Sequence, residues 1–188
     1  MADSNITKRA LAAALKELME THHFAKISVS DICEKCDMNR KSFYYHFKDK
    51  YDLVNWIYDT EFIAVVKNKK YQTDWELMED LCTYFYVNRE FYRHALKIKG
   101  QNSFSEHFRE LLLPLVGDSL KGILGEEDIQ EFYINFFADA ITITIERWIL
   151  NKDCVEPKEL IALLKSCLQL AAAKANQDLG QNEEASVK

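Results

Sequence analysis

Two residue patterns that could support chemistry lie next to each other in the segment CEKCDMNRKSFYYHF, residues 33–47. Cys33 and Cys36 have the spacing of a metal-binding or redox pair. The residues that follow bring together cations, hydroxyl groups and an imidazole, all of which can donate hydrogen bonds to phosphate or base edges. The segment could therefore hold a metal, carry out a thiol reaction, or bind a nucleic acid.

The cysteine pair is better explained by packing than by chemistry. No second Cys or His pair at zinc-like spacing lies nearby, so four ligands cannot be assembled locally. A redox pair usually begins a helix, whereas Cys36 ends a predicted one, where the helix dipole disfavours a thiolate. We therefore expect no metal, no cofactor and no catalytic residue, with a redox or metal protein that uses Cys33 and Cys36 as a remote alternative.

The elements that must position the donors have the dimensions of a helix-turn-helix. Ser28 and Asp31 stand three residues apart in SVSDIC, which is the arrangement of a capping box and predicts that a two-turn helix begins there. DMN then breaks the chain, and a second short helix is predicted from about Arg40 to Phe47. In a helix-turn-helix the second helix enters the major groove of DNA.

The second short helix has an apolar side and a donor side. Phe43 and Phe47 are four residues apart, so they share one face and can anchor the helix to a core. A solvated surface would explain Arg40 and Lys41 taken alone, but DNA contact is favoured beside the other donors. The predicted DNA-binding residues are Ser28, Asn39, Arg40, Lys41, Ser42, Tyr44, Tyr45, His46 and Lys50, the last of these on a phosphate.

The stretch SVSDICEKCDMNRKSFYYHFKDKYDLV resembles the DNA-binding segment of the TetR family of bacterial transcriptional regulators. The similarity covers roughly residues 5–60 and includes the Ser-Val cap, the Asp-Ile pair, the Tyr-x-His-Phe type of pattern and a lysine three residues later. The turn departs from the Ala-Gly-Val-Ser that is common in the family. Without that glycine, Asp37 or Asn39 is predicted to adopt the left-handed conformation.

The resemblance implies a homodimeric regulator that binds a palindromic double-stranded DNA operator and responds to an unknown effector through a divergent helical domain. A looser similarity, in FYRHALKIKGQNSF and the final helices, is to the subgroup of DhaS-type regulators of dihydroxyacetone kinase genes. This second resemblance implies an alternative function, in which the C-terminal domain of a co-activator binds a protein partner.

The composition predicts an all-α protein. The 188 residues include only 5 Gly and 2 Pro, which favours long uninterrupted helices. We expect a three-helix head with the helix-turn-helix at 1–50, a linking helix at 50–69, a larger helical ligand-binding and dimerisation domain at 70–175, and a disordered tail at 176–188. A capping box is predicted at 73–76 and a helix cap at 103–106. Pro114 is expected to kink or end its helix, and AITITI (140–145) is assigned to a helix although it alternates like a strand.

Charge is unevenly distributed along the chain. Residues 1–50 hold nine Lys or Arg against seven Asp or Glu, whereas the remainder holds 15 against 23. The head is therefore mildly basic and the body acidic, which suits a head that binds DNA. The first segment is amphipathic and charged, and no apolar run reaches the roughly 18 residues of a membrane span. We expect a cytoplasmic protein without a membrane partner.

The last two predicted helices are the candidates for self-association. FADAITITIERWIL is apolar around most of its circumference, so a helix of this sequence needs neighbours on more than one side. Completion of one monomer's core is the alternative explanation for the same pattern. The predicted dimer-interface residues are Ala138, Ile141, Ile145, Trp148, Leu160, Leu164 and Leu168.

Overall fold

The chain folds into packed helices, and no strand occurs among the residues that the computed structural model describes, which are 2–97, 103–124, 131–167 and 169–170. The all-α assignment made from the sequence is confirmed. The predicted tail at 176–188 lies outside the described residues. The helices are α1 (Ala2–Thr21), η1 (Phe24–Lys26), α2 (Val29–Lys35), α3 (Arg40–His46), α4 (Lys50–Tyr58), η2 (Asp59–Ile63), α5 (Ala64–Val66), α6 (Asp74–Val87), α7 (Arg89–Ala95), α8 (Phe104–Leu124) and α9 (Glu131–Leu150). A further helical stretch covers 157–167 and 169–170.

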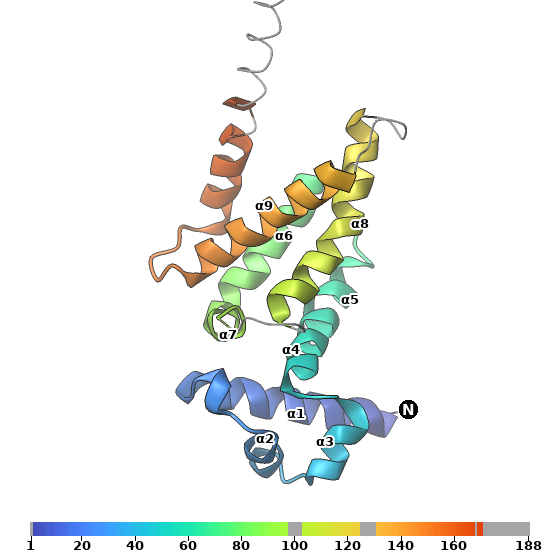
Figure 1. Ribbon diagram of the computed structural model, residues 1–188, viewed down its shortest axis with the longest axis vertical. Coiled ribbons are helices and arrows are strands. Elements are labelled where there is room, and N and C mark those ends of the chain that lie inside the picture. The colour runs from blue at the N-terminus through green and yellow to red at the C-terminus, as the bar shows by residue number, and fades with distance from the viewer. Residues whose placement is uncertain (1, 98–102, 125–130, 168, 171–188) are drawn as a thin grey trace, which may run out of the picture.

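The first three α-helices form a small unit at one end of the molecule, and α4 leads from it towards the other helices (Figure 1). Helix α1 packs against α2, α3 and α4, and α2 packs against α3. Their shared core is fully buried and apolar, so it fixes the two short helices that could not persist alone. The core side chains are Leu11, Leu15, Ile32, Phe43, Leu53 and Ile57.

The linking helix contains a π-helical turn that the sequence did not reveal. One continuous helix over 50–69 was predicted, but α4 passes into the π-helix η2 and then into the short α5. Within η2, the carboxylate of Glu61 accepts from Nζ of Lys16 on α1 at 2.5 and 2.6 Å and from the hydroxyl of Tyr84 on α6 at 3.2 Å. The π-turn therefore joins the head to the body.

An aromatic cluster fills the body between α4, α6, α7 and α8. The buried ring of Tyr58 lies 5.7 Å from that of Phe85, 5.2 Å from that of Phe104 and 6.0 Å from that of Phe108. The hydroxyls of Tyr84 and Tyr92 hydrogen bond to each other at 2.8 Å within the same cluster. These contacts hold the upper part of α4 against the body.

Helices α8 and α9 pack side by side and run antiparallel (Figure 1). Arg109 forms an ion pair with Asp139 and donates to Asn135 at 2.7 Å, and Ser105 hydrogen bonds to Glu146. Pro114 was predicted to kink or end its helix; α8 continues through it, so it does not end the helix, and the kink stays a prediction. The packing against α9 offsets the lost backbone hydrogen bond.

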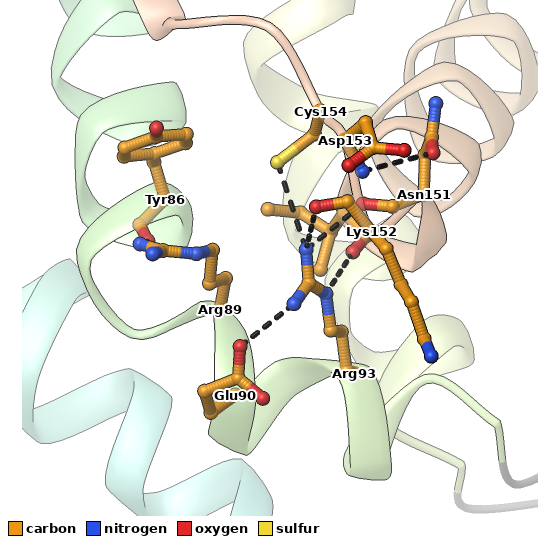
Figure 2. Close-up of polar contacts among 9 residues, drawn as sticks. Tyr86, Arg89, Glu90, Arg93, Asn151, Lys152, Asp153 and Cys154 are labelled. Carbon is orange, nitrogen blue, oxygen red and sulfur yellow. Dashed lines mark hydrogen bonds and ion pairs between the residues drawn. The ribbon is translucent and has the colours of Figure 1, made fainter.

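Helix α7 meets the end of α9 through Arg93. This side chain points into the turn after α9 and donates to the carbonyl oxygens of Asn151 and Lys152 at 2.8 and 3.3 Å (Figure 2). On its other side, α7 contacts α1, and the ring of His94 lies 5.8 Å from that of His23, two residues beyond the end of α1. Helix α7 therefore touches both the head and the turn that follows α9.

Three further local predictions have mixed outcomes. The 140–145 stretch is helical within α9, as predicted. Ser103 accepts from the backbone N–H of Glu106 at 3.3 Å, so that cap is confirmed. The hydroxyl of Thr73 caps nothing, because Glu76 reaches the backbone N–H of Gln72 at 2.9 Å instead.

Candidate nucleic-acid interface and self-association surface

Helix α2 begins at the capping box that the sequence predicts. The backbone N–H of Asp31 donates to Oγ of Ser28 at 3.1 Å, and the backbone N–H of Ser28 donates to the Asp31 carboxylate at 2.7 Å. The backbone hydrogen bond from Ser28 lowers the pKa of Asp31, with a smaller contribution from the Ser28 side chain. Ser28 is exposed, and its hydroxyl still has a hydrogen to donate.

The turn between α2 and α3 is made without glycine. Asp37 has φ of 54°, so it takes the left-handed position that the sequence assigned to Asp37 or Asn39. Asn39 is instead the extended N-cap of α3, and its Oδ1 accepts from the backbone N–H of Ser42 at 2.8 Å and from its hydroxyl at 3.2 Å. Asn39 and Ser42 thus fix the start of α3, and the Asn39 amide group keeps its own donors.

Helix α3 is held by two buried rings and presents its donors outwards. Phe43 and Phe47 are buried with their centroids 5.7 Å apart. Tyr45 is 83% exposed, and the guanidinium carbon of Arg40 lies 5.8 Å from the ring centre of Tyr44. The side chains that face solvent on this helix are Arg40, Lys41, Tyr44 and Tyr45, with Ser42 and His46 half-buried.

Lys50, which was predicted to contact a phosphate, is bonded within the head in this structure. Its Nζ donates to the carbonyl oxygens of Phe24 at 2.7 Å and Ile27 at 2.6 Å, with Ala25 at 3.4 Å. The ammonium therefore points to the carbonyls of the turn between α1 and α2. The neighbouring Lys48 is exposed.

The cysteines lie where packing explains them. Cys33 is buried, and burial raises the pKa of its thiol, with a further rise from Cys36. Cys36 donates from Sγ to the carbonyl oxygen of Ile32 at 3.2 Å. A raised thiol pKa opposes the thiolate that metal binding or redox chemistry needs. No group of three or more potential metal ligands occurs in the described part of the chain.

Comparison with known proteins explains this head. Residues 10–57 match the model of the tetR family of bacterial regulatory proteins, and residues 73–170 match a model described as a transcriptional regulator C-terminal region. The chain belongs to the TetR family. It is a DNA-binding transcriptional regulator and not an enzyme. Within the described ranges, no helix is both long and apolar enough to cross a bilayer.

The chain is also similar to an individual DhaS protein. The HTH-type dhaKLM operon transcriptional activator DhaS of Lactococcus lactis subsp. lactis (strain IL1403) is 33% identical over 110 residues, a match that spans 57% of this chain and 57% of that protein. The match therefore covers less than two thirds of the relative.

Two solved structures share the TetR-family fold. A dihydroxyacetone kinase operon activator DhaS has a TM-score of 0.61 at 24% identity, over 88% of this chain and 97% of that one. A TetR transcriptional regulator from Streptococcus agalactiae 2603V has a TM-score of 0.67 at 21% identity, over 86% and 93%. At these identities the likeness concerns the fold.

Most of the residues predicted for a dimer interface lie within the monomer. The structure buries Ala138, Ile145, Trp148 and Leu160 against the chain's own helices. Trp148 also donates from its indole N–H to the carbonyl oxygen of Val155 at 2.9 Å. Intrachain packing already covers these four side chains in the monomer. Ile141 and Leu164 are half-buried, and Leu168 lies outside the described residues.

A different set of side chains on the same two helices is exposed. Phe132 is 67% and Phe136 56% exposed, and the rings stack 6.2 Å apart on the outer face of α9. Successive exposed apolar residues on α9 are spaced by four, seven and seven positions, so they form one apolar stripe along the helix. The stripe, here called the α9 stripe, consists of Phe132, Phe136, Ile143 and Leu150, and Leu163 and Leu170 are exposed on the following helical stretch. The helical period of these residues could have revealed it in the sequence.

Proposed function

We propose that two copies of this chain associate through the α9 stripe and the exposed face of the last helical stretch, so that two heads bind the half-sites of a near-palindromic operator. The stripe is the observation that carries the proposal, because large exposed apolar side chains at helical spacing are covered in stable proteins. A two-fold dimer would place two α3 helices about one DNA turn, or a multiple of it, apart.

Within each head, the proposed DNA contacts are the exposed or half-exposed donors around α3. Arg40 and Lys41 supply charge for phosphates, while Tyr44, Tyr45 and His46 offer donors and rings for base edges. Ser28 and Asn39, at the two helix starts, have donors that can reach phosphates. In this proposal, residues 1–50 bind DNA, and residues 70–175 associate with the second copy and bind the effector.

Sedimentation and DNA binding test this function together. Ile143→Glu and Phe136→Glu place a carboxylate on the α9 stripe and should give folded monomers with much weaker binding to the promoter of the chain's own operon. Val87→Glu is the matched control, since Val87 is 71% exposed at the end of α6, outside the stripe. A wild-type protein that sediments as a monomer at micromolar concentration yet binds this promoter tightly would rule the dimer out.

The aromatic cluster favours an alternative in which the signal is a protein partner and not a small molecule. Because stacked rings fill the interior between α4, α6, α7 and α8, a signal that acts on the surface requires less rearrangement than one that enters the core. The body would then bind a protein partner and control a dihydroxyacetone kinase operon, as the names of its DhaS relatives suggest. A thermal shift with dihydroxyacetone alone would support a small-molecule effector instead.

A further inference from the structure

The ammonium group of Lys50 is saturated by the protein itself. An ammonium has three hydrogens to donate. Nζ reaches the carbonyl oxygens of Phe24, Ala25 and Ile27 at 2.7, 3.4 and 2.6 Å. It also lies 4.5 Å from the centre of the Phe24 ring, which adds a cation–π contact. The charge of Lys50 is therefore bound within the head by carbonyl groups and by an aromatic ring.

The three acceptors belong to one element, the turn between α1 and α2. Carbonyls near the end of a short helix have few intrahelical partners, and a cation is a favoured group there. The carbonyl of Phe24 also accepts from the backbone N–H of Ile27 at 3.1 Å. The same turn leads directly into Ser28, whose backbone N–H is fixed by Asp31. Lys50 and Asp31 thus pin consecutive parts of one loop, and this loop sets the direction in which α2 leaves α1.

We propose that Lys50 is a positioning residue that ties the first turn of α4 to the α1–α2 turn, and that it acts on DNA binding only through the orientation of α2 and α3. Helix α4 continues through η2 towards the body. The contact between Lys50 and the α1–α2 turn is therefore also the point where the linking helix is attached to the head. The proposal rests on the DNA contacts proposed above for its binding readout, and on the fold alone for its stability readout.

Burial supports this role over a phosphate contact. Lys50 is half-buried, and desolvation lowers its pKa, an effect that the nearby Asp31 partly opposes. To reach a phosphate, the side chain would have to give up its bonds to three carbonyl groups, of which that of Phe24 would keep the backbone N–H of Ile27 at 3.1 Å. Lys48 and Lys41 are exposed and need break no such contacts.

The dependence of DNA affinity on salt separates the two roles. Each phosphate contact contributes about 0.9 to the slope of log affinity against log salt concentration, so its loss lowers the slope by about 1. The measurement uses full-length Lys50→Met with a duplex of the chain's own promoter. We expect an unchanged slope, with affinity reduced about tenfold at every salt concentration. Lys41→Met is the matched control and should lower the slope by about 1.

Two readouts that need no DNA complete the test. Lys50→Met should lower the melting temperature by several degrees and speed hydrogen exchange of the amides in η1 and α2, while Lys48→Met should change neither. Lys50→Gln, which keeps a polar donor, provides the same measurements if Lys50→Met does not fold. A slope lowered by about 1 in a Lys50 variant, or unchanged melting and exchange, overturns the proposal. Failure of the wild type to bind the promoter would count against the proposed function and not against the positioning role of Lys50.

Discussion

Nε of Arg93 donates to the carbonyl oxygen of Ile149 at 2.7 Å, which joins α7 to the last turn of α9. The side chain is only 14% exposed and also pairs with Glu90 at 2.7 Å. Because the last carbonyls of a helix have no partners within it, this guanidinium acts as the C-terminal cap of α9. The turn that leads from α9 to the last helical stretch is therefore held by α7.

Removal of this cap should destabilise the body. We expect Arg93→Met to lower the free energy of unfolding by about 2 kcal/mol, because several partly buried carbonyls lose a charged donor. Urea unfolding measures the change. Arg89→Met is the control, since Arg89 donates one bond, to the Tyr86 carbonyl at 2.9 Å, and points away from the turn (Figure 2). Equal losses in both variants would contradict the capping role.

Operator binding should depend on the exposed face of α3. Lys41→Ala with Tyr44→Ala removes a charge, a hydroxyl and the Tyr44 ring, which lies edge-on to the buried Phe43 at 5.5 Å. We expect a weaker complex and a salt slope smaller by about 1, from the lysine, with a small loss of thermal stability from the ring contact. Electrophoretic mobility shifts over a salt series measure both. Unchanged affinity would remove α3 from the interface, and Lys158→Ala provides a charge-loss control on the body.

The two cysteines should differ in their tolerance of a hydroxyl group. Cys33→Ser buries a polar group among apolar neighbours and should cost about 1–3 kcal/mol of stability. Cys36→Ser should cost less, because the serine hydroxyl can keep the bond to the Ile32 carbonyl. Denaturant unfolding distinguishes them. Stoichiometric zinc in the purified wild type that is lost in both variants would show instead that the pair binds metal.

The free energy of unfolding should decrease as the pH falls, in a way that depends on His94. Burial lowers the pKa of His94 from its ordinary 6.5, and the nearby Lys97 and His23 lower it further, while Glu90 opposes them. The unfolded chain therefore binds a proton more readily than the folded one, so the stability from neutral His94 is present above pH 6.5 and is lost as the pH falls through its folded pKa.

His94→Gln should flatten this pH dependence. Melting curves between pH 5.5 and pH 8 measure it, and the wild type and the variant should differ most in slope below about pH 6.5. Parallel curves over the whole range would show that another group is responsible.

Local signals made the DNA-reading head predictable from the sequence. Ser28 with Asp31 and Asn39 with Ser42 act over three residues, so the chain itself contains both partners of each cap. Lys50 could not be assigned in this way, because its acceptors lie 23–26 residues earlier and only the folded head brings them together.

The self-association surface shows a second limit. Ala138, Ile145 and Trp148 are as apolar as the exposed members of α9, so composition cannot distinguish a face covered by the same chain from one left open. The distinction depends on where α6, α7 and α8 lie around α9. The π-turn was equally hidden, since the residues of η2 fit an ordinary helix.

The π-turn at Asp59–Ile63 has a consequence for length variation in this chain. A single π-turn corresponds to one residue inserted into an α-helix without rotation of the helix on either side. Deletion of one residue here can therefore be absorbed by a return to regular α-helical pairing, with the head and body kept in phase. A deletion within α4 itself would turn the head by about 100° relative to the body. The segment is thus the part of the connector where a change in length is best tolerated.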